Sequence, residues 1–126
     1  MPTLSVAYLS SLLSSLEEDP PAEHELARVL SNCRLVYFDV GNGRQYLDRV
    51  RAKLRELDIP LEVYDVLSEK VWEAARDMSC GDGYGYEVRA YALHDKYLII
   101  VAAKCDGVDS YEIVRVYDLS QCDSAS

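Results

Sequence analysis

The stretch Tyr97–Ala103, which reads YLIIVAA, decides the fold class of this chain. It is apolar throughout and carries no charge. A short apolar run rich in β-branched residues is typical of a strand that is buried on both faces. Arg34–Val40 (RLVYFDV) has a similar character, with many residues that favour strands. We therefore expect both stretches to be interior strands of one compact sheet.

The segments around Tyr97–Ala103 predict an antiparallel meander. Tyr86–Leu93 and Tyr111–Tyr117 alternate apolar and polar residues, as strands with one covered face do. Short polar connections, His94–Lys96 and Lys104–Ser110, join them to the central run. Connections of this length favour neighbouring antiparallel strands. The alternating last strand is also a candidate for an exposed sheet edge, which proteins cover or use for pairing.

The segments after the first strand predict a β-α-β unit. A helix is expected over Arg44–Leu57, where apolar residues recur at helical spacing. Leu61–Val66 (LEVYDV) follows a proline and is interpreted as the second strand of the unit. Ser68 is expected to cap a further helix that ends near Met78. Two parallel strands with a right-handed crossover followed by the meander make an α/β protein with a mixed sheet of five strands.

The N-terminal residues predict two helices in front of the sheet. Leucines at helical spacing indicate a helix over Thr3–Glu17, and a second helix runs from about Ala22 to Ser31. The first helix has more apolar residues than a narrow core-facing stripe needs, so it either packs on the sheet or covers a second subunit. The 126 residues fit a single α/β domain. We divide it into a helical part (1–32), a sheet core (33–119) and a frayed tail (120–126).

Composition excludes several function classes. The formal net charge of −9 argues against broad contact with nucleic-acid phosphates, which requires clustered Lys and Arg. It also argues against docking on anionic membranes. No apolar run approaches the about 20 residues of a membrane span, and the first residues lack the basic start of a signal peptide. We therefore expect a cytoplasmic protein that binds a protein partner or associates with itself.

The four cysteines are Cys33, Cys80, Cys105 and Cys122, and none lie in a C-x-x-C pair. No zinc or other metal site is therefore expected. Free, partly buried thiols are the ordinary expectation in a cytosol. However, scarce Asn and Gln, with more Arg than Lys, indicate a hyperthermophile, where cytosolic disulfides occur. One or two disulfides are therefore an alternative, and the sequence does not choose among the three pairings.

A glycine turn (GNGR, residues 41–44) follows the first strand and precedes a helix. Backbone N–H groups at a helix start favour anions, and glycines let a ligand approach the backbone. Asp65 ends the next expected strand, where dinucleotide-binding folds place a ribose-binding acid. The stretch from Asp39 to Asp65 resembles the cofactor-binding start of S-adenosylmethionine-dependent methyltransferases, with Gln45 in place of their third glycine. The resemblance implies that a nucleoside-type or other anionic small molecule binds at Gly41, Asn42, Gly43, Arg44 and Asp65. The alternative to a binding site is a purely structural tight turn, in which glycine supplies backbone freedom.

The segment Leu93–Val101 (LHDKYLIIV) resembles the His-x-Lys segment of the phospholipase D superfamily of phosphodiesterases and nucleases. The resemblance implies that His94 is a nucleophile and that Lys96 holds phosphate. The Asp that the family has five residues after the Lys is Val101 here, and its downstream Gly-Ser-x-Asn element is absent. Nucleophilic catalysis needs an orienting partner. The segment is therefore either a polar hairpin turn or a degenerate or active phosphodiesterase site.

Ten tyrosines against one phenylalanine indicate interaction surface rather than chemistry. Tyr84, Tyr86 and Tyr91 are expected on one side of the sheet, and tyrosine is favoured at interfaces because it is apolar at one end and hydrogen-bonds at the other. Each catalytic resemblance lacks a residue that its chemistry requires, and no cofactor is expected. We therefore predict a small acidic non-catalytic interaction protein, either a homodimer or a subunit of a larger complex.

Overall fold

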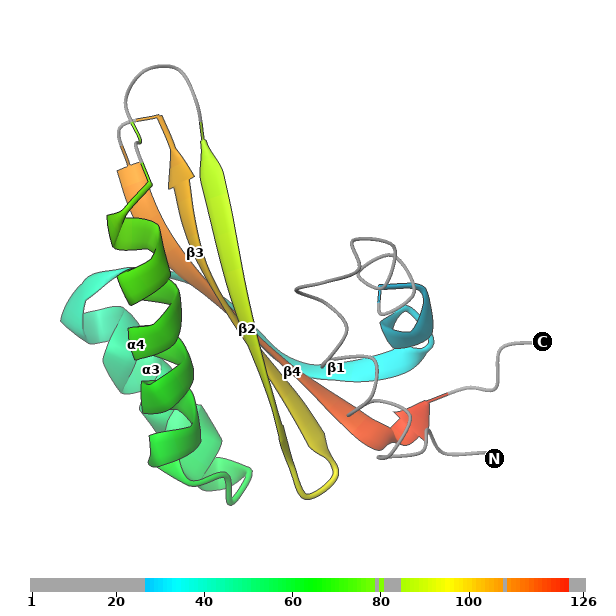
Figure 1. Cartoon of the computed structure of the whole chain (residues 1–126). Coiled ribbons are helices and arrows are strands. Elements are labelled where there is room, and N and C mark those ends of the chain that lie inside the picture. Colours follow the sequence, from blue (N-terminus) through cyan, green and yellow to red (C-terminus); the bar gives the residue numbers. More distant parts are fainter. Residues whose placement is uncertain (1–26, 79, 81–84, 108, 123–126) are drawn as a thin grey trace.

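The computed structural model describes residues 27–78, 80, 85–107 and 109–122 of the chain. In chain order its elements are β1 (Cys33–Gly41), α3 (Gly43–Glu56), α4 (Leu61–Arg76), β2 (Tyr86–His94), β3 (Tyr97–Asp106) and β4 (Asp109–Cys122). The four strands form one antiparallel sheet in the order β1-β4-β3-β2. Both long helices cover the same face of this sheet (Figure 1). The protein is therefore α/β, with an antiparallel sheet in the described part.

The main core lies between the sheet and the two helices. α3 buries Tyr46, Val50 and Leu54, which recur at helical spacing along one side. Every second residue of β3 faces these helices, and Ile99 and Val101 are fully buried there. On the other face of the sheet a smaller cluster forms, in which Leu30, Leu98, Ile100, Leu119 and Cys122 pack together.

The expectation for Tyr97–Ala103 is confirmed. β3 pairs with β2 on one side and with β4 on the other, and every residue of this stretch is buried. The meander of β2, β3 and β4 is confirmed as well, and its first connection is a two-residue turn in which Asp95 adopts a left-handed conformation with φ 53°. The strongest apolar signal in the sequence therefore marks the centre of the sheet.

Arg34–Val40 and Tyr111–Tyr117 both lie in strands, as expected, but their expected positions in the sheet, interior for the first and a candidate exposed edge for the second, are wrong. β1 is an edge strand and is half exposed, whereas β4 lies between β1 and β3. β4 spans 14 residues, long enough to pair with both neighbours over most of its length. Its alternation reflects one face packed under the helices and one face that is only partly covered. Apolar content therefore did not indicate interior position for β1.

The expected strand Leu61–Val66 is wrong, and so is the expected cap at Ser68. Both belong to α4, a single helix that follows Pro60. Its buried residues continue through the whole stretch at helical spacing and are Tyr64, Leu67, Val71 and Ala75. A 16-residue helical pattern outweighs six residues with strand preference, because tertiary burial overrides local propensity. The β-α-β unit and the fifth strand therefore do not form.

The ends of the chain agree with expectation only in part. The first expected helix, Thr3–Glu17, lies outside the described residues. Of the second, residues 27–31 are described; residues 27–30 are helical and Ser31 lies in the turn that follows. The tail was expected to fray from Ser120, but β4 continues to Cys122.

Two disulfides link strand ends to other parts of the chain: one joins β1 to β4, and the other joins β3 to the segment between α4 and β2. Cys33 is joined to Cys122 across β1 and β4, over a sequence separation of 89 residues. Cys80 is joined to Cys105 at the end of β3, over a separation of 25 residues. None of the four cysteines is free. The alternative with two disulfides therefore describes this structure, and the pairing that the sequence left open is the one between 33 and 122 and between 80 and 105.

The two disulfides predict that the protein is more stable when its four cysteines are oxidised than when they are reduced. Closing loops of 89 and 25 residues lowers the entropy of the unfolded chain enough to contribute roughly 3 to 5 kcal/mol each in the chain-entropy model. Denaturant unfolding in the presence of a strong reductant should therefore show a much lower free energy of unfolding than unfolding under oxidising conditions. Thiol titration of the unreduced, denatured protein should detect no thiol. Four reactive thiols in that titration would contradict both pairs.

Candidate functional site

The most unusual polar group in the described residues is the carboxylate of Glu112, which lies on β4 and is only 4% exposed. Four side chains from the two helices donate hydrogen bonds to it. Tyr46 (2.9 Å) and Tyr64 donate their hydroxyls to Oε1. Ser68 Oγ (2.7 Å) and Trp72 Nε1 (2.8 Å) donate to Oε2. One carboxylate thus connects α3 and α4 to the sheet.

The four contacts match the acceptor capacity of the Glu112 carboxylate. A carboxylate has two oxygens with about four lone-pair sites, and four donors fill them. Burial, together with the negative charge of Glu112, raises the pKa of Tyr46 above its usual range. Burial and the hydrogen bond to Glu112 do the same for the pKa of Tyr64. Both phenols therefore remain protonated donors at neutral pH.

No cation neutralises Glu112 in the described part of the chain, where it makes no ion pair. A buried charge costs several kcal/mol of desolvation, which its hydrogen bonds offset. Glu112 also borders a cavity of about 290 Å³ between α3, α4 and the sheet. The lining residues are Asn42, Gly43, Tyr46, Leu47, Tyr64, Ser68, Trp72 and Glu112. The cavity is therefore small, and it combines three aromatic side chains with a single acidic one.

The glycine turn at residues 41–44 lies beside this cavity. β1 ends at Gly41 and α3 begins at Gly43, as the turn predicted. A Cβ on Gly41 would lie 3.1 Å from the Tyr46 ring, so glycine lets that ring pack closely. Gly43 has φ 82°, a backbone conformation that residues with a side chain rarely adopt. The structure at the start of α3 therefore explains why both positions are occupied by glycine.

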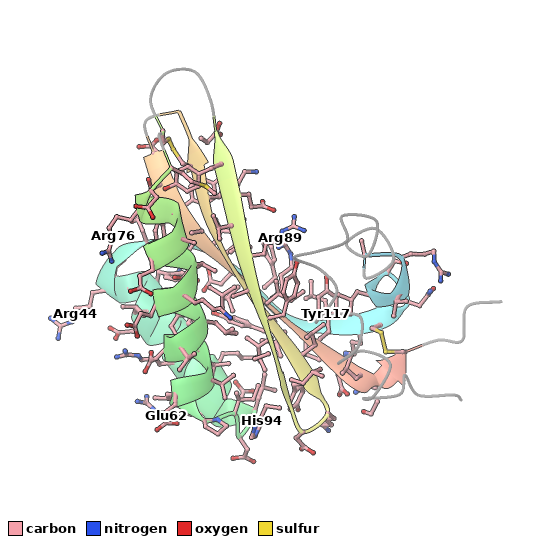
Figure 2. All side chains as sticks on the ribbon, in the orientation of Figure 1. Arg44, Glu62, Arg76, Arg89, His94 and Tyr117 are labelled. Atoms are coloured by element: carbon pink, nitrogen blue, oxygen red, sulfur yellow. A yellow bond between two sulfur atoms is a disulfide. The ribbon has the colours of Figure 1, made fainter. Side chains whose placement is uncertain are left out.

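The residues proposed to bind an anion do not gather around one pocket. Asn42 and Gly43 line the cavity. Arg44 points away from the protein into solvent (Figure 2). Asp65 lies on the surface of α4 and pairs with Arg51 at 3.6 Å. Because Leu61–Val66 is helical, Asp65 does not end a strand, and the likeness to methyltransferases loses its second anchor.

His94 is the last residue of β2, and Lys96 is the second residue of the turn between β2 and β3. His94 pairs with Tyr97 in the ladder. Lys96 Nζ lies 3.9 Å from Asp118 Oδ2 and 5.5 Å from the centre of the Tyr97 ring. Neither His94 nor Lys96 lines a cavity described here. Their geometry is that of a hairpin turn with a solvated lysine.

The three tyrosines expected on one side are not together. Tyr84 lies outside the described residues. Tyr86 packs toward the helices, whereas Tyr91 points to the opposite face of the sheet, because the two are an odd number of residues apart. Tyr91 lines a second cavity of about 290 Å³ on that face. The expectation of one shared face is therefore wrong for Tyr86 and Tyr91.

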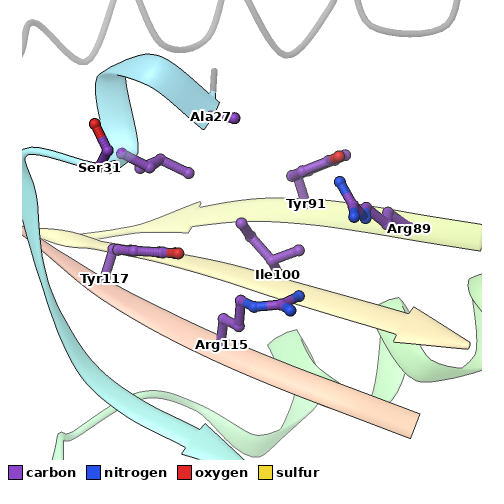
Figure 3. A pocket seen from close by; sticks show the side chains of 8 residues that line it. Ala27, Ser31, Arg89, Tyr91, Ile100, Arg115 and Tyr117 are labelled. Carbon is purple, nitrogen blue, oxygen red and sulfur yellow. The ribbon is translucent and has the colours of Figure 1, made fainter. Parts of the chain in front are cut away.

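The second cavity combines arginines and tyrosines on the face opposite α3 and α4 (Figure 3). Arg89 and Tyr91 come from β2, and Arg115 and Tyr117 come from β4. Ile100 separates them on β3, where it pairs with both Tyr91 and Arg115. Arg89 forms an ion pair with Glu87 of its own strand.

The edge strand β1 carries an apolar row on this same face. Leu35, Phe38 and Val40 are 44%, 50% and 40% exposed. They pair across to β4 residues of the second face, Phe38 with Arg115 and Leu35 with Tyr117. The Arg115 guanidinium lies 5.4 Å from the centre of the Phe38 ring. These three residues, Leu35, Phe38 and Val40, are named the β1 apolar row.

The helix-facing side of β1 is held by a polar contact. Arg49 of α3 donates two hydrogen bonds to Asp39, from Nε (3.0 Å) and from Nη2 (3.1 Å). The Tyr37 hydroxyl donates to the same carboxylate at 2.7 Å. The bond from Arg49 lowers the pKa of Asp39 below its usual range. The edge strand is therefore fixed to α3 on one face, while its outer edge pairs with no strand in the described part.

No family model, no curated protein and no solved structure matches this chain. Within residues 27–122, as far as they are described, no group of His, Cys, Asp and Glu could hold a metal ion. The helices of that same part are too short or too polar to cross a membrane. The function is therefore inferred from the residues and their geometry alone.

Sequence reasoning missed Glu112 and its four donors. Glu112 was one polar position in an alternating strand, and Tyr64 and Ser68 were assigned to a strand and a cap. A signal was present nevertheless. Along one helix, Tyr64, Ser68 and Trp72 recur every four residues and place three hydrogen-bond donors on one face. Hydrogen-bond donors on the buried side of a helix need acceptors, so three donors in a row indicate an acceptor that they share.

Replacement of the charge tests this network. Glu112→Gln puts an amide donor against side chains that are themselves donors, so at least one buried hydrogen bond is lost. The free energy of unfolding should fall by about 3 kcal/mol, measured by denaturant unfolding. Glu73→Gln, an exposed glutamate of α4 next to Trp72, is the matched control and should change it by less than about 0.5 kcal/mol. Equal stability of the two variants would show that the network is not structural.

The glycine turn gives a second test. Gly43→Ala should lower the free energy of unfolding by about 1 kcal/mol, since alanine is strained at φ 82° although space for its Cβ is open. Gln45→Ala, two residues further along the exposed side of α3, should be neutral. Thermal unfolding of both variants provides the comparison. A Gly43→Ala variant as stable as the natural protein would mean that the turn is not held in this conformation.

Proposed function

We propose that this chain is a non-catalytic interaction protein that forms a homodimer through the β1 edge. The observation that carries the proposal is the β1 apolar row, exposed on a strand whose outer backbone edge pairs with no described strand. Natural proteins protect such edges with charge, proline, bulges or a covering element. β1 has a register irregularity between Leu35 and Tyr37, but no lysine and no proline.

A second copy of the chain suits this edge. Two β1 strands related by a two-fold axis would pair antiparallel, and each would present the same surface to the other. In the register that places Leu35 of each copy opposite Phe38 of the other, Arg34 of each copy comes opposite Asp39 of the other. Apolar residues then meet on one face and opposite charges on the other, which favours this pairing over a shifted one. The dimer would contain a continuous sheet of eight strands, twice the four seen here.

The acidity of the chain supports the choice of the β1 edge as the place of contact. With a net charge of −9, two copies repel each other over most of their surfaces. Acidic residues are frequent on the exposed side of α4, where Glu62, Asp65, Glu69 and Glu73 lie. The face that carries the β1 apolar row instead carries Arg89 and Arg115. Association at the β1 edge therefore keeps the acidic α4 helices of two copies apart, because α4 packs on β2 and β3, whereas α3 packs on β1.

The oligomeric state tests the proposal. The natural protein should behave as a dimer in light scattering coupled to size-exclusion chromatography, at concentrations of about 10 μM and above. Phe38→Lys should produce a monomer, because it places like charges at the centre of the pairing strands. Val66→Lys is the matched control, because Val66 is 62% exposed on α4 and far from the edge. A natural protein that is monomeric at millimolar concentration, or two variants with equal mass, would overturn the proposal.

A further inference from the structure

The cavity beside Glu112 has no role in the association proposed above, and its chemistry points to a ligand of its own. It lies on the helix-covered face, whereas the β1 apolar row lies on the other. Its only charged lining residue is Glu112, which is buried and accepts four hydrogen bonds. A buried carboxylate with no cationic side chain paired to it in the described residues makes the cavity electrostatically favourable for a cation.

The hydrogen bonds to Glu112 restrict which cation fits. Both of its oxygens already accept two bonds each, from Tyr46 and Tyr64 on Oε1 and from Ser68 and Trp72 on Oε2. A primary ammonium has three N–H donors, and each needs an acceptor when it is buried. A quaternary ammonium has no N–H group and needs none. The saturated carboxylate therefore favours a methylated ammonium, which is attracted by charge alone.

The aromatic lining strengthens this preference. Two tyrosines and one tryptophan border the cavity, and the faces of these rings attract cations that have been stripped of water. Tyr46 already contacts one cation, since the Arg49 guanidinium lies 5.9 Å from its ring centre. That guanidinium forms its ion pair with Asp39 and not with Glu112. A carboxylate with aromatic rings around it is a recurring means of binding quaternary ammonium groups.

The alternative of an anion at the start of α3 is less favourable. The first turn of α3 has no acidic residue, which by itself would suit an anion. However, Glu112 faces the same cavity as Asn42 and Gly43, and an anion there would meet a like charge at short range. The Asn42 amide, moreover, donates to the Ser110 carbonyl at 3.0 Å instead of pointing to a ligand. The volume of about 290 Å³ lies at the lower end of ligand sites, so only a small molecule fits.

We propose that the cavity lined by Tyr46, Tyr64, Trp72 and Glu112 binds a small quaternary ammonium compound, with choline as the simplest probe. Trp72 is the only tryptophan of the chain, so its fluorescence reports on the cavity directly. Choline chloride is titrated at constant ionic strength, and 3,3-dimethylbutan-1-ol, the uncharged molecule of the same shape, is titrated as the control. Choline should bind about tenfold more tightly than the alcohol and should raise the thermal midpoint.

Two variants on the same helix show where choline binds. Leu47→Lys places an ammonium group of the protein at the half-buried lining position, and choline affinity should fall at least about tenfold. Gln45→Lys adds the same charge at an exposed position of α3 outside the lining and should bind choline as the natural protein does. Neither substitution touches a donor to Glu112.

The outcomes separate cleanly. Equal affinity for choline and the alcohol, or no response to either up to about 50 mM, would overturn the proposal. Equal loss of affinity in both lysine variants would assign the effect to general charge and overturn it as well. If Leu47→Lys does not fold, the comparison of choline with the alcohol on the natural protein decides. Because the Phe38→Lys monomer retains the cavity, choline binding by that variant distinguishes failure of this site from failure of the dimer.

Discussion

The hydrogen bonding of Glu112 is the interaction on which the arrangement of helices and sheet depends. A carboxylate on β4 is expensive to bury, and it becomes tolerable only when the helices supply donors. One of these donors comes from α3 and three come from α4, so both helices must take defined positions along the sheet. Apolar packing alone tolerates sliding of a helix along a sheet, whereas four directed bonds to one group do not. The glycine turn serves the same arrangement, because Gly41 lets the Tyr46 ring pack closely at the start of α3.

This arrangement divides the molecule into two faces with different properties. The helices cover one face, and α4 carries four exposed acidic side chains there, Glu62, Asp65, Glu69 and Glu73. The other face carries Arg89 and Arg115 among tyrosines (Figure 3). It also leaves the β1 apolar row exposed. Disulfides at the ends of β1 and β3 hold the strands that border this surface. The outer edge of β1, which pairs with no described strand, and the exposed β1 apolar row are the features on which the proposed self-association rests.

The sequence predicted the fold where one local signal dominated. Tyr97–Ala103 has no competing reading and lies at the centre of the sheet. Arg34–Val40 was expected inside the sheet because it is rich in apolar residues. Apolar composition does not distinguish an interior strand from an edge strand whose apolar side chains are exposed. Leu61–Val66 was misassigned because six residues were judged without the ten that follow, in which helical spacing continues. Glu112 could not be recognised as a site, since its donors lie 40 to 66 residues away along the chain and meet only after the helices pack.

The exchange rate of one proton tests the Glu112 network most directly. Trp72 supplies a single indole N–H signal in a nuclear magnetic resonance spectrum, and its partner is Glu112 Oε2 at 2.8 Å. A proton held in a buried bond between helix and sheet exchanges with solvent only when the structure opens. The structure predicts exchange at least about a hundredfold slower than in free tryptophan, and loss of that protection in Glu112→Leu. Exchange of the Trp72 indole proton at the rate of the free amino acid would contradict it.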